Sequence, residues 1–127
     1  MTEELVTLET AKLLKEKGFK EDVSVFYELV CEEGSYEYEL FESYDAQNYN
    51  ASVYSFSAPT QYIAQKWLRE TKNLHIEISY MYENYWIYDI LTIPNHDLVW
   101  LSDRPIIHYK SYEEALEAGI QEALKLI

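Results

Sequence analysis

The chain has 127 residues, a hydrophobic fraction of 48% and a formal net charge of −13 at pH 7. This length is typical of one domain with a substantial core, and we expect a single compact domain over residues 1–127. The acidic balance repels other anions, so we expect neither nucleic acid nor a membrane surface as a partner.

The start of the chain and its cysteine content indicate a cytoplasmic protein. Residues 1–4 read Met-Thr-Glu-Glu, without the basic and apolar segments of a secretory signal, and no apolar run approaches the ~18 residues of a membrane helix. Cys31 is the single cysteine and cannot form an internal disulfide, which fits a reducing compartment.

A first helix is predicted from about Leu8 to Lys17, where apolar side chains recur at helical spacing. Gly18 then serves as a left-handed C-cap, and Phe19 folds back on Leu14.

Two strands follow. Alternation from Val23 to Val30 predicts the first, and a turn at residues 32–35 leads to the second. In the second strand Glu37 and Glu39 share a solvated face, while Tyr36 and Tyr38 point to the opposite face. Residues 42–57 are rich in Ser, Asn and Tyr, and we expect mostly loop there, with a short strand near residues 53–56.

A central helix is predicted from near Pro59 to about Thr71, with Ser57 as its candidate cap. Its polar side carries Lys66, Arg69 and Lys72, and we expect these cations to pair with the acids that precede the helix.

Period-two patterns then predict a hairpin of residues 74–81 and 85–93, turning at Glu83-Asn84. Two further short strands are expected at residues 98–101 and 106–109. The last helix is capped by Ser111 with Glu114 in a capping box, and Glu117 and Gln121 are placed on its water-facing side. The sequence therefore predicts an α+β fold, with an antiparallel sheet of about four to five strands packed against three helices.

The sequence offers little catalytic chemistry. It contains no phosphate-binding glycine loop and no nucleophile elbow, and its histidines, His75, His96 and His108, lie far apart. The His96-Asp97 doublet resembles metal ligands of helical phosphohydrolases, but it follows Pro94-Asn95 in an expected turn. We expect no catalytic residue, no cofactor and no metal.

The charge layout is more informative. No Lys or Arg occurs between Lys20 and Lys66, whereas nine Asp and Glu residues do, and tyrosines are interleaved with them. A second group of aromatic residues occupies the hairpin of residues 74–93. Tyrosine and tryptophan are enriched at protein interfaces, although the same side chains also cover sheets. The candidate interaction surface comprises Tyr36, Glu37, Tyr38, Glu39, Tyr82, Tyr85 and Trp86.

Three blocks carry a resemblance to known proteins: residues 11–19, AKLLKEKGF; residues 58–70, with Ala58-Pro59-Thr60-Gln61 and Gln65-Lys66-Trp67-Leu68-Arg69-Glu70; and residues 111–127, beginning SYEEALEAG. They resemble a family of short proteins encoded by bacteria and their phages. The resemblance implies a phage or mobile-element context and assigns no functional residue.

Three functions remain open. The first is a small non-enzymatic module that binds a protein through an acidic, aromatic surface, in its sharpest form by mimicking nucleic acid towards a basic host protein. The second is a self-assembling structural or accessory protein, a homo-oligomer joined through the aromatic hairpin. The third is an enzyme of unrecognised type, which would show a pocket with perturbed acids.

Overall fold

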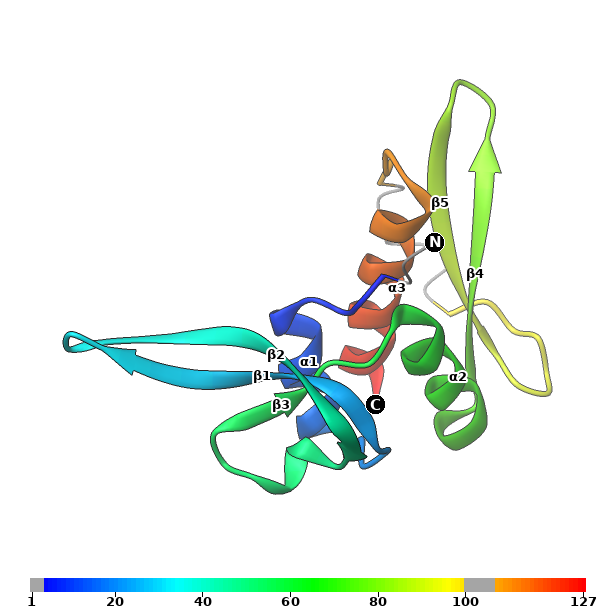
Figure 1. The fold of residues 1–127 in the computed structure, drawn as a ribbon. Coiled ribbons are helices and arrows are strands. Elements are labelled where there is room, and N and C mark those ends of the chain that lie inside the picture. Colours follow the sequence, from blue (N-terminus) through cyan, green and yellow to red (C-terminus); the bar gives the residue numbers. More distant parts are fainter. Residues whose placement is uncertain (1–3, 100–106) are drawn as a thin grey trace.

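The computed structural model describes residues 4–99 and 107–127, which form an α+β fold (Figure 1). Its elements are α1 (Leu8–Glu16), β1 (Val23–Glu32), β2 (Ser35–Gln47), the 3-10 helix η1 (Tyr49–Ala51), β3 (Ser55–Ser57), α2 (Gln61–Lys72), β4 (Leu74–Met81), β5 (Tyr85–Thr92) and α3 (Tyr112–Leu126). The predicted α+β class is confirmed, and the described strands divide between two antiparallel sheets, one ordered β2-β1-β3 and the other β4-β5.

Helix α3 lies at the centre of the fold, against both strands of the β4–β5 sheet and against α1 and α2 (Figure 1). Its buried stripe is Ala115, Leu116, Gly119, Ile120, Ala123 and Leu124. A Cβ atom added at Gly119 would lie 2.7 Å from Ile76 Cγ2, so the helix approaches the sheet as closely as a residue without a side chain allows.

The ends of the first two helices follow local rules. The Phe19 N–H donates to the Leu14 carbonyl at 2.9 Å and Gly18 has φ +94°, which confirms the predicted end of α1. The N-cap of α2 differs from the predicted one: it is Thr60, whose Oγ1 accepts from the Ile63 N–H at 3.2 Å. The predicted cap, Ser57, lies in β3 instead.

Helix α3 begins with half of the predicted capping box. Ser111 Oγ accepts from the Glu114 N–H at 3.1 Å. The Glu114 carboxylate turns back one residue further than expected, to the Lys110 N–H at 3.2 Å. Both side chains therefore satisfy backbone donors at the start of the helix.

The prediction of mostly loop over residues 42–57 was wrong for residues 42–47, whereas the short strand expected near residues 53–56 is present as β3. Strand β2 continues to Gln47, because a bulge opposite residues 23–25 lets it keep pairing with β1. The Asn50 side chain then donates to the Phe19 carbonyl and accepts from the Ser57 N–H, at 2.9 and 2.8 Å. These long-range bonds order a segment whose composition is typical of a loop.

The second hairpin is confirmed, with a register from Leu74↔Thr92 to Met81↔Tyr85 and positive φ at Glu83 and Asn84. The further strands expected at residues 98–101 and 106–109 are isolated bridges, Leu91↔Leu98 and Trp86↔Tyr109, as far as the structure describes them. Residues 100–106 lie outside the described residues. Within the described ranges, no helix combines the length and apolar character required to span a bilayer.

Candidate interaction surface

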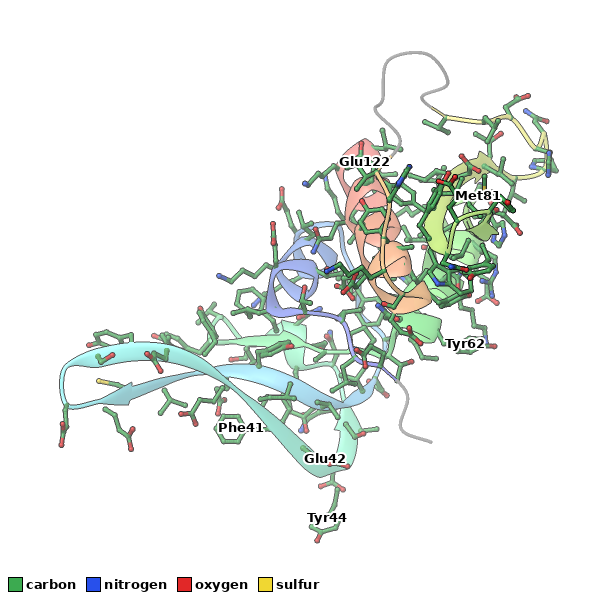
Figure 2. All side chains as sticks on the ribbon, turned by 90° about the horizontal axis from the view of Figure 1, so that it is seen from above. Phe41, Glu42, Tyr44, Tyr62, Met81 and Glu122 are labelled. Atoms are coloured by element: carbon green, nitrogen blue, oxygen red, sulfur yellow. The ribbon has the colours of Figure 1, made fainter. Side chains whose placement is uncertain are left out.

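The hairpin of β1 and β2 projects away from the helices (Figures 1 and 2). Its tip is a two-residue turn at Glu33 and Gly34, whose φ values are +50° and +83°. Positive φ at both positions is typical of the tight hairpin turn that matches the twist of paired strands. Tyr44, further along β2, points away from the rest of the molecule and is fully exposed (Figure 2).

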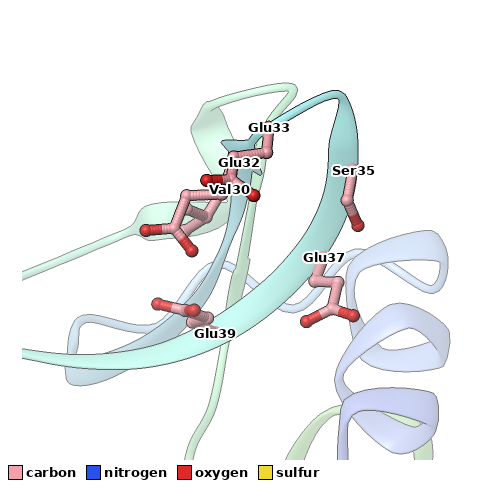
Figure 3. A pocket seen from close by; sticks show the side chains of 6 residues that line it. All are labelled: Val30, Glu32, Glu33, Ser35, Glu37 and Glu39. Carbon is pink, nitrogen blue, oxygen red and sulfur yellow. The ribbon is translucent and has the colours of Figure 1, made fainter.

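The register of this hairpin places four of its glutamates on one side. Glu28 pairs with Glu39, and the next two same-face pairs are Val30↔Glu37 and Glu32↔Ser35. Cross-strand neighbours share a face of the sheet. We call the face that carries Glu28, Glu32, Glu37 and Glu39 the acidic face. With Val30, Glu33 and Ser35, three of these glutamates line a concavity of about 350 Å³ near the hairpin tip (Figure 3).

No described lysine or arginine forms an ion pair with the acidic face. The prediction that cations of α2 pair with these acids is therefore wrong for the described residues. Helix α2 packs on β4 and α3 instead, on the far side of the molecule from the hairpin tip (Figure 1), where Lys72 Nζ lies 5.5 Å from the centre of the Trp67 ring. The negative charge of the acidic face is left uncompensated by the described part of the chain.

Aromatic rings border the acidic face at the base of the hairpin. Phe26 pairs with Phe41 across the strands, with ring centres 5.8 Å apart, and Tyr49 of η1 stacks on Phe26 at 3.9 Å. Because Phe26 precedes Glu28 by two residues, these rings and the glutamates lie on the same side of the sheet. A partner on this face would meet both charge and exposed aromatic surface.

The opposite face of the hairpin turns towards α1. Tyr38 is half-buried, with its ring centre 5.3 Å from that of Phe56 and 5.2 Å from Lys12 Nζ. Tyr36, nearer the tip, is 69% exposed. The predicted alternation of Tyr36 and Tyr38 with Glu37 and Glu39 is therefore present. Of the two tyrosines, Tyr36 has the side chain that is free to meet a partner.

Lys15 holds the base of the same sheet. Its ammonium donates to the carbonyls of Ser52 and Ser55, the latter at 2.9 Å, and lies 4.9 Å from the Phe56 ring centre. Burial lowers the pKa of this ammonium. The lysines nearest to the hairpin thus contact rings and carbonyls rather than glutamates.

The remaining predicted residues lie on the other hairpin, which points in a different direction (Figure 1). Tyr82 is 91% exposed beside the β4–β5 turn. Tyr85 and Trp86 are half-buried: Tyr85 stacks on His108 with ring centres 3.7 Å apart, and Trp86 lies against Tyr80 at 4.8 Å. The candidate residues therefore form two separate surfaces.

The prediction that Glu117 faces water was wrong, because its carboxylate joins the three helices. Glu117 Oε2 accepts from the Thr7 N–H at 3.0 Å, from Thr7 Oγ1 at 3.1 Å and from Thr10 Oγ1. Glu117 Oε1 accepts from Gln61 Nε2 at 2.9 Å. Gln121, also predicted to face water, donates to Thr10 Oγ1 at 2.9 Å.

This network gives Glu117 a structural role. Four donors from the start of α1 and from α2 meet one carboxylate, three at Oε2 and one at Oε1. The neighbouring Tyr27 hydroxyl donates to the Val6 carbonyl at 3.0 Å, and burial, with a smaller contribution from the Glu117 charge, raises the pKa of Tyr27. Helical spacing alone could not reveal these contacts, because the donors come from residues remote in sequence.

Histidines and acids elsewhere are dispersed. His96 has φ +62° and donates its N–H to the Thr92 carbonyl at 2.8 Å, in the turn predicted for the His96-Asp97 doublet. His75 Nε2 pairs with Glu77 Oε2 at 3.0 Å on the half-exposed side of β4. Within residues 4–99 and 107–127, no three His, Cys, Asp or Glu side chains are grouped to hold a metal ion.

The chain matches no known protein-family model, no curated protein sequence and no solved structure.

Proposed function

We propose that this protein is a small non-enzymatic module that binds a basic surface of another protein through the acidic face of its β1–β2 hairpin. The observation that supports it is the uncompensated charge of Glu28, Glu32, Glu37 and Glu39 on one side of a projecting hairpin. Like charges on neighbouring strand positions destabilise the fold. A partner that supplies Lys and Arg side chains relieves this repulsion and is steered towards the face.

The aromatic border adds a second component to binding. Phe41 is 37% exposed beside the glutamates, and aromatic side chains contribute strongly to protein interfaces. Charge is screened over about 10 Å at 0.1 M salt, whereas apolar contact is not. We therefore expect binding that weakens with salt without vanishing.

A phage origin, as the resemblance of the helical blocks implies, suits this role. We propose a nucleic-acid-handling protein of the host as the partner, because such proteins carry basic surfaces. The mimicry of nucleic acid is only approximate. Same-face residues of a strand lie about 6.7 Å apart, whereas phosphates follow each other by about 3.4 Å along one DNA strand.

The test is capture of partners from a host-cell lysate by the tagged protein, at low and at high salt, with identification by mass spectrometry. The variant Glu32→Gln/Glu37→Gln/Glu39→Gln removes charge from the acidic face. The control Glu16→Gln/Glu70→Gln/Glu122→Gln removes the same charge from α1, α2 and α3. We expect basic proteins to be captured by the wild type and the control but not by the first variant. Equal capture by both variants would refute a role of the acidic face.

Self-association through the other hairpin is a second candidate. Tyr80 and Tyr82 are 58% and 91% exposed there, and Tyr112 is 40% exposed nearby. Exposed aromatic surface of this kind is typical of interfaces. Sedimentation of the wild type and of Tyr80→Ser/Tyr82→Ser over a range of concentrations tests it: a wild-type dimer that the substitutions dissociate supports this candidate, and a monomer at all concentrations rejects it.

A further inference from the structure

Strand β2 forms the outer edge of its sheet, and its free backbone groups belong to a defined set of residues. On β1, the Val25 carbonyl accepts from the Ala58 N–H and the Leu29 N–H donates to the Tyr54 carbonyl, at 2.9 and 3.1 Å. The backbone N–H and C=O groups of odd-numbered residues of β1 therefore point to β3, and those of even-numbered residues point to β2.

The antiparallel register extends this pattern to β2. Glu37 and Glu39 pair with Val30 and Glu28, so their N–H and C=O groups point inwards to β1. The N–H and C=O groups of Tyr36, Tyr38 and Leu40 consequently point outwards, and no other described strand pairs with β2. We call this row the outer edge.

We infer that the outer edge binds an extended basic segment of the partner by antiparallel strand addition, which rests on the proposed function and specifies its mode. In such a pair the residues opposite Tyr36, Tyr38 and Leu40 exchange backbone hydrogen bonds with β2. The residues opposite Glu37 and Glu39 occupy the other positions, where Cα atoms approach to about 4.5 Å and side chains lie closest.

The two faces of the hairpin define the sequence of the bound segment. Side chains opposite Glu37 and Glu39 lie on the acidic face, so Lys or Arg suits every second position. Side chains between them lie beside Tyr36 and Leu40, which are 69% and 48% exposed, so apolar residues suit those positions. The ligand is an extended segment that alternates basic and apolar residues.

The same charges disfavour a second copy of this chain as the occupant. Antiparallel pairing of two β2 strands would bring acidic faces together, and like charges opposite each other are destabilising. Charged side chains on an edge strand also protect proteins from aggregation. If the glutamates served only to prevent aggregation, a peptide of alternating basic and apolar residues would bind by non-specific charge attraction alone, without backbone hydrogen bonds to the outer edge.

The probe is the fluorescent peptide Lys-Val-Lys-Val-Lys-Val-Lys, titrated with the full-length protein at low salt and followed by anisotropy. Its control is the same peptide with N-methylated valines, which keeps the charge but removes the N–H groups that strand addition requires. We expect the methylated peptide to bind about tenfold or more weakly, since several backbone hydrogen bonds are lost. Equal affinity of both peptides would overturn strand addition.

A matched pair of variants tests the same point on the protein. Leu40→Pro removes an outward N–H that does not pair with β1, whereas Leu40→Ala removes the side chain and keeps that N–H. We expect the peptide to bind Leu40→Pro about tenfold more weakly than Leu40→Ala. Amide exchange gives a further measure, because peptide binding should slow exchange at Tyr36, Tyr38 and Leu40.

These results separate the two proposals. Capture of a basic partner that requires the acidic face, without discrimination between the two peptides or slowed exchange, would leave the proposed function standing and refute strand addition. Capture that ignores the acidic face would refute the proposed function, whatever the peptide does.

Discussion

Glu28 of β1 and Glu39 of β2 are direct cross-strand neighbours, and no described lysine or arginine forms an ion pair with either carboxylate. Ser55 Oγ donates to Glu28 Oε1 at 3.3 Å, which satisfies that carboxylate in part without neutralising it. Two negative side chains at opposed positions cost stability, so this pair is a place where the sequence departs from the best choice for folding.

The substitution Glu39→Gln should therefore raise the free energy of unfolding by about 0.2–1 kcal/mol at low salt, because it removes one charge of a repelling pair. Urea denaturation at low and at high salt measures it, and the gain should shrink as salt screens the repulsion. Glu122→Gln is the control, since Glu122 lies on α3 rather than opposite another acid in a sheet. A loss of stability in Glu39→Gln would contradict the assigned register.

Glu117→Ala should destabilise the fold by about 2–3 kcal/mol, because hydrogen-bond donors of Thr7, Thr10 and Gln61 lose a charged acceptor. Thermal and urea unfolding measure the loss. Glu122→Ala on the same helix should change stability by no more than about 0.5 kcal/mol. Similar effects of the two substitutions would show that Glu117 does not join the helices in solution.

The Tyr27 hydroxyl should make stability depend on pH in the alkaline range. Its folded-state pKa is raised above the ordinary value of 10.0, so the folded protein holds this proton more tightly than the unfolded chain. The contribution is fully present below pH 10 and is lost as pH rises through the folded-state pKa. Above pH 10 the unfolding free energy of the wild type should therefore fall relative to that of Tyr27→Phe. A wild-type unfolding free energy that stays constant or rises relative to that of Tyr27→Phe over this pH range would contradict this assignment.

Gly119→Ala should destabilise the protein despite the higher helix propensity of alanine, which favours the variant by about 1 kcal/mol. The added Cβ would lie 2.7 Å from Ile76 Cγ2 and 3.2 Å from Tyr88 Cγ. Overpacking of a core costs about 1–3 kcal/mol. In an Ile76→Ala background the same substitution should cost less, and a double-mutant cycle of unfolding free energies measures that difference. An absence of coupling would show that the helix and sheet separate easily at this point.

Elements with local signals were predictable from the sequence. Gly18 ends α1 with the Phe19–Leu14 bond, Ser111 caps α3, and Glu83-Asn84 turns the second hairpin, because each feature depends on residues close together in the chain. The same-face placement of Glu37 and Glu39 also followed from strand alternation.

Features that depend on distant partners were missed. Asn50 orders residues 48–57 through Phe19 and Ser57, and Glu117 meets donors from two other helices. Alternation likewise indicates which side chains share a face but not which sheet a strand joins, so the placement of the two hairpins in separate sheets, and of the candidate residues on two separate surfaces, was not foreseen. Composition records neither kind of contact, because both arise only when the chain is folded.

The β1–β2 hairpin lies between opposite charges, with Lys12 and Lys15 of α1 on one side of the sheet and the glutamates of the acidic face on the other. This separation gives the hairpin and α1 together an electric dipole directed across the sheet. A basic protein that diffuses near it experiences a torque as well as an attraction, and is turned towards the glutamates before contact. Orientation during approach raises the rate of productive encounters, while the lifetime of the complex depends on the contacts made afterwards.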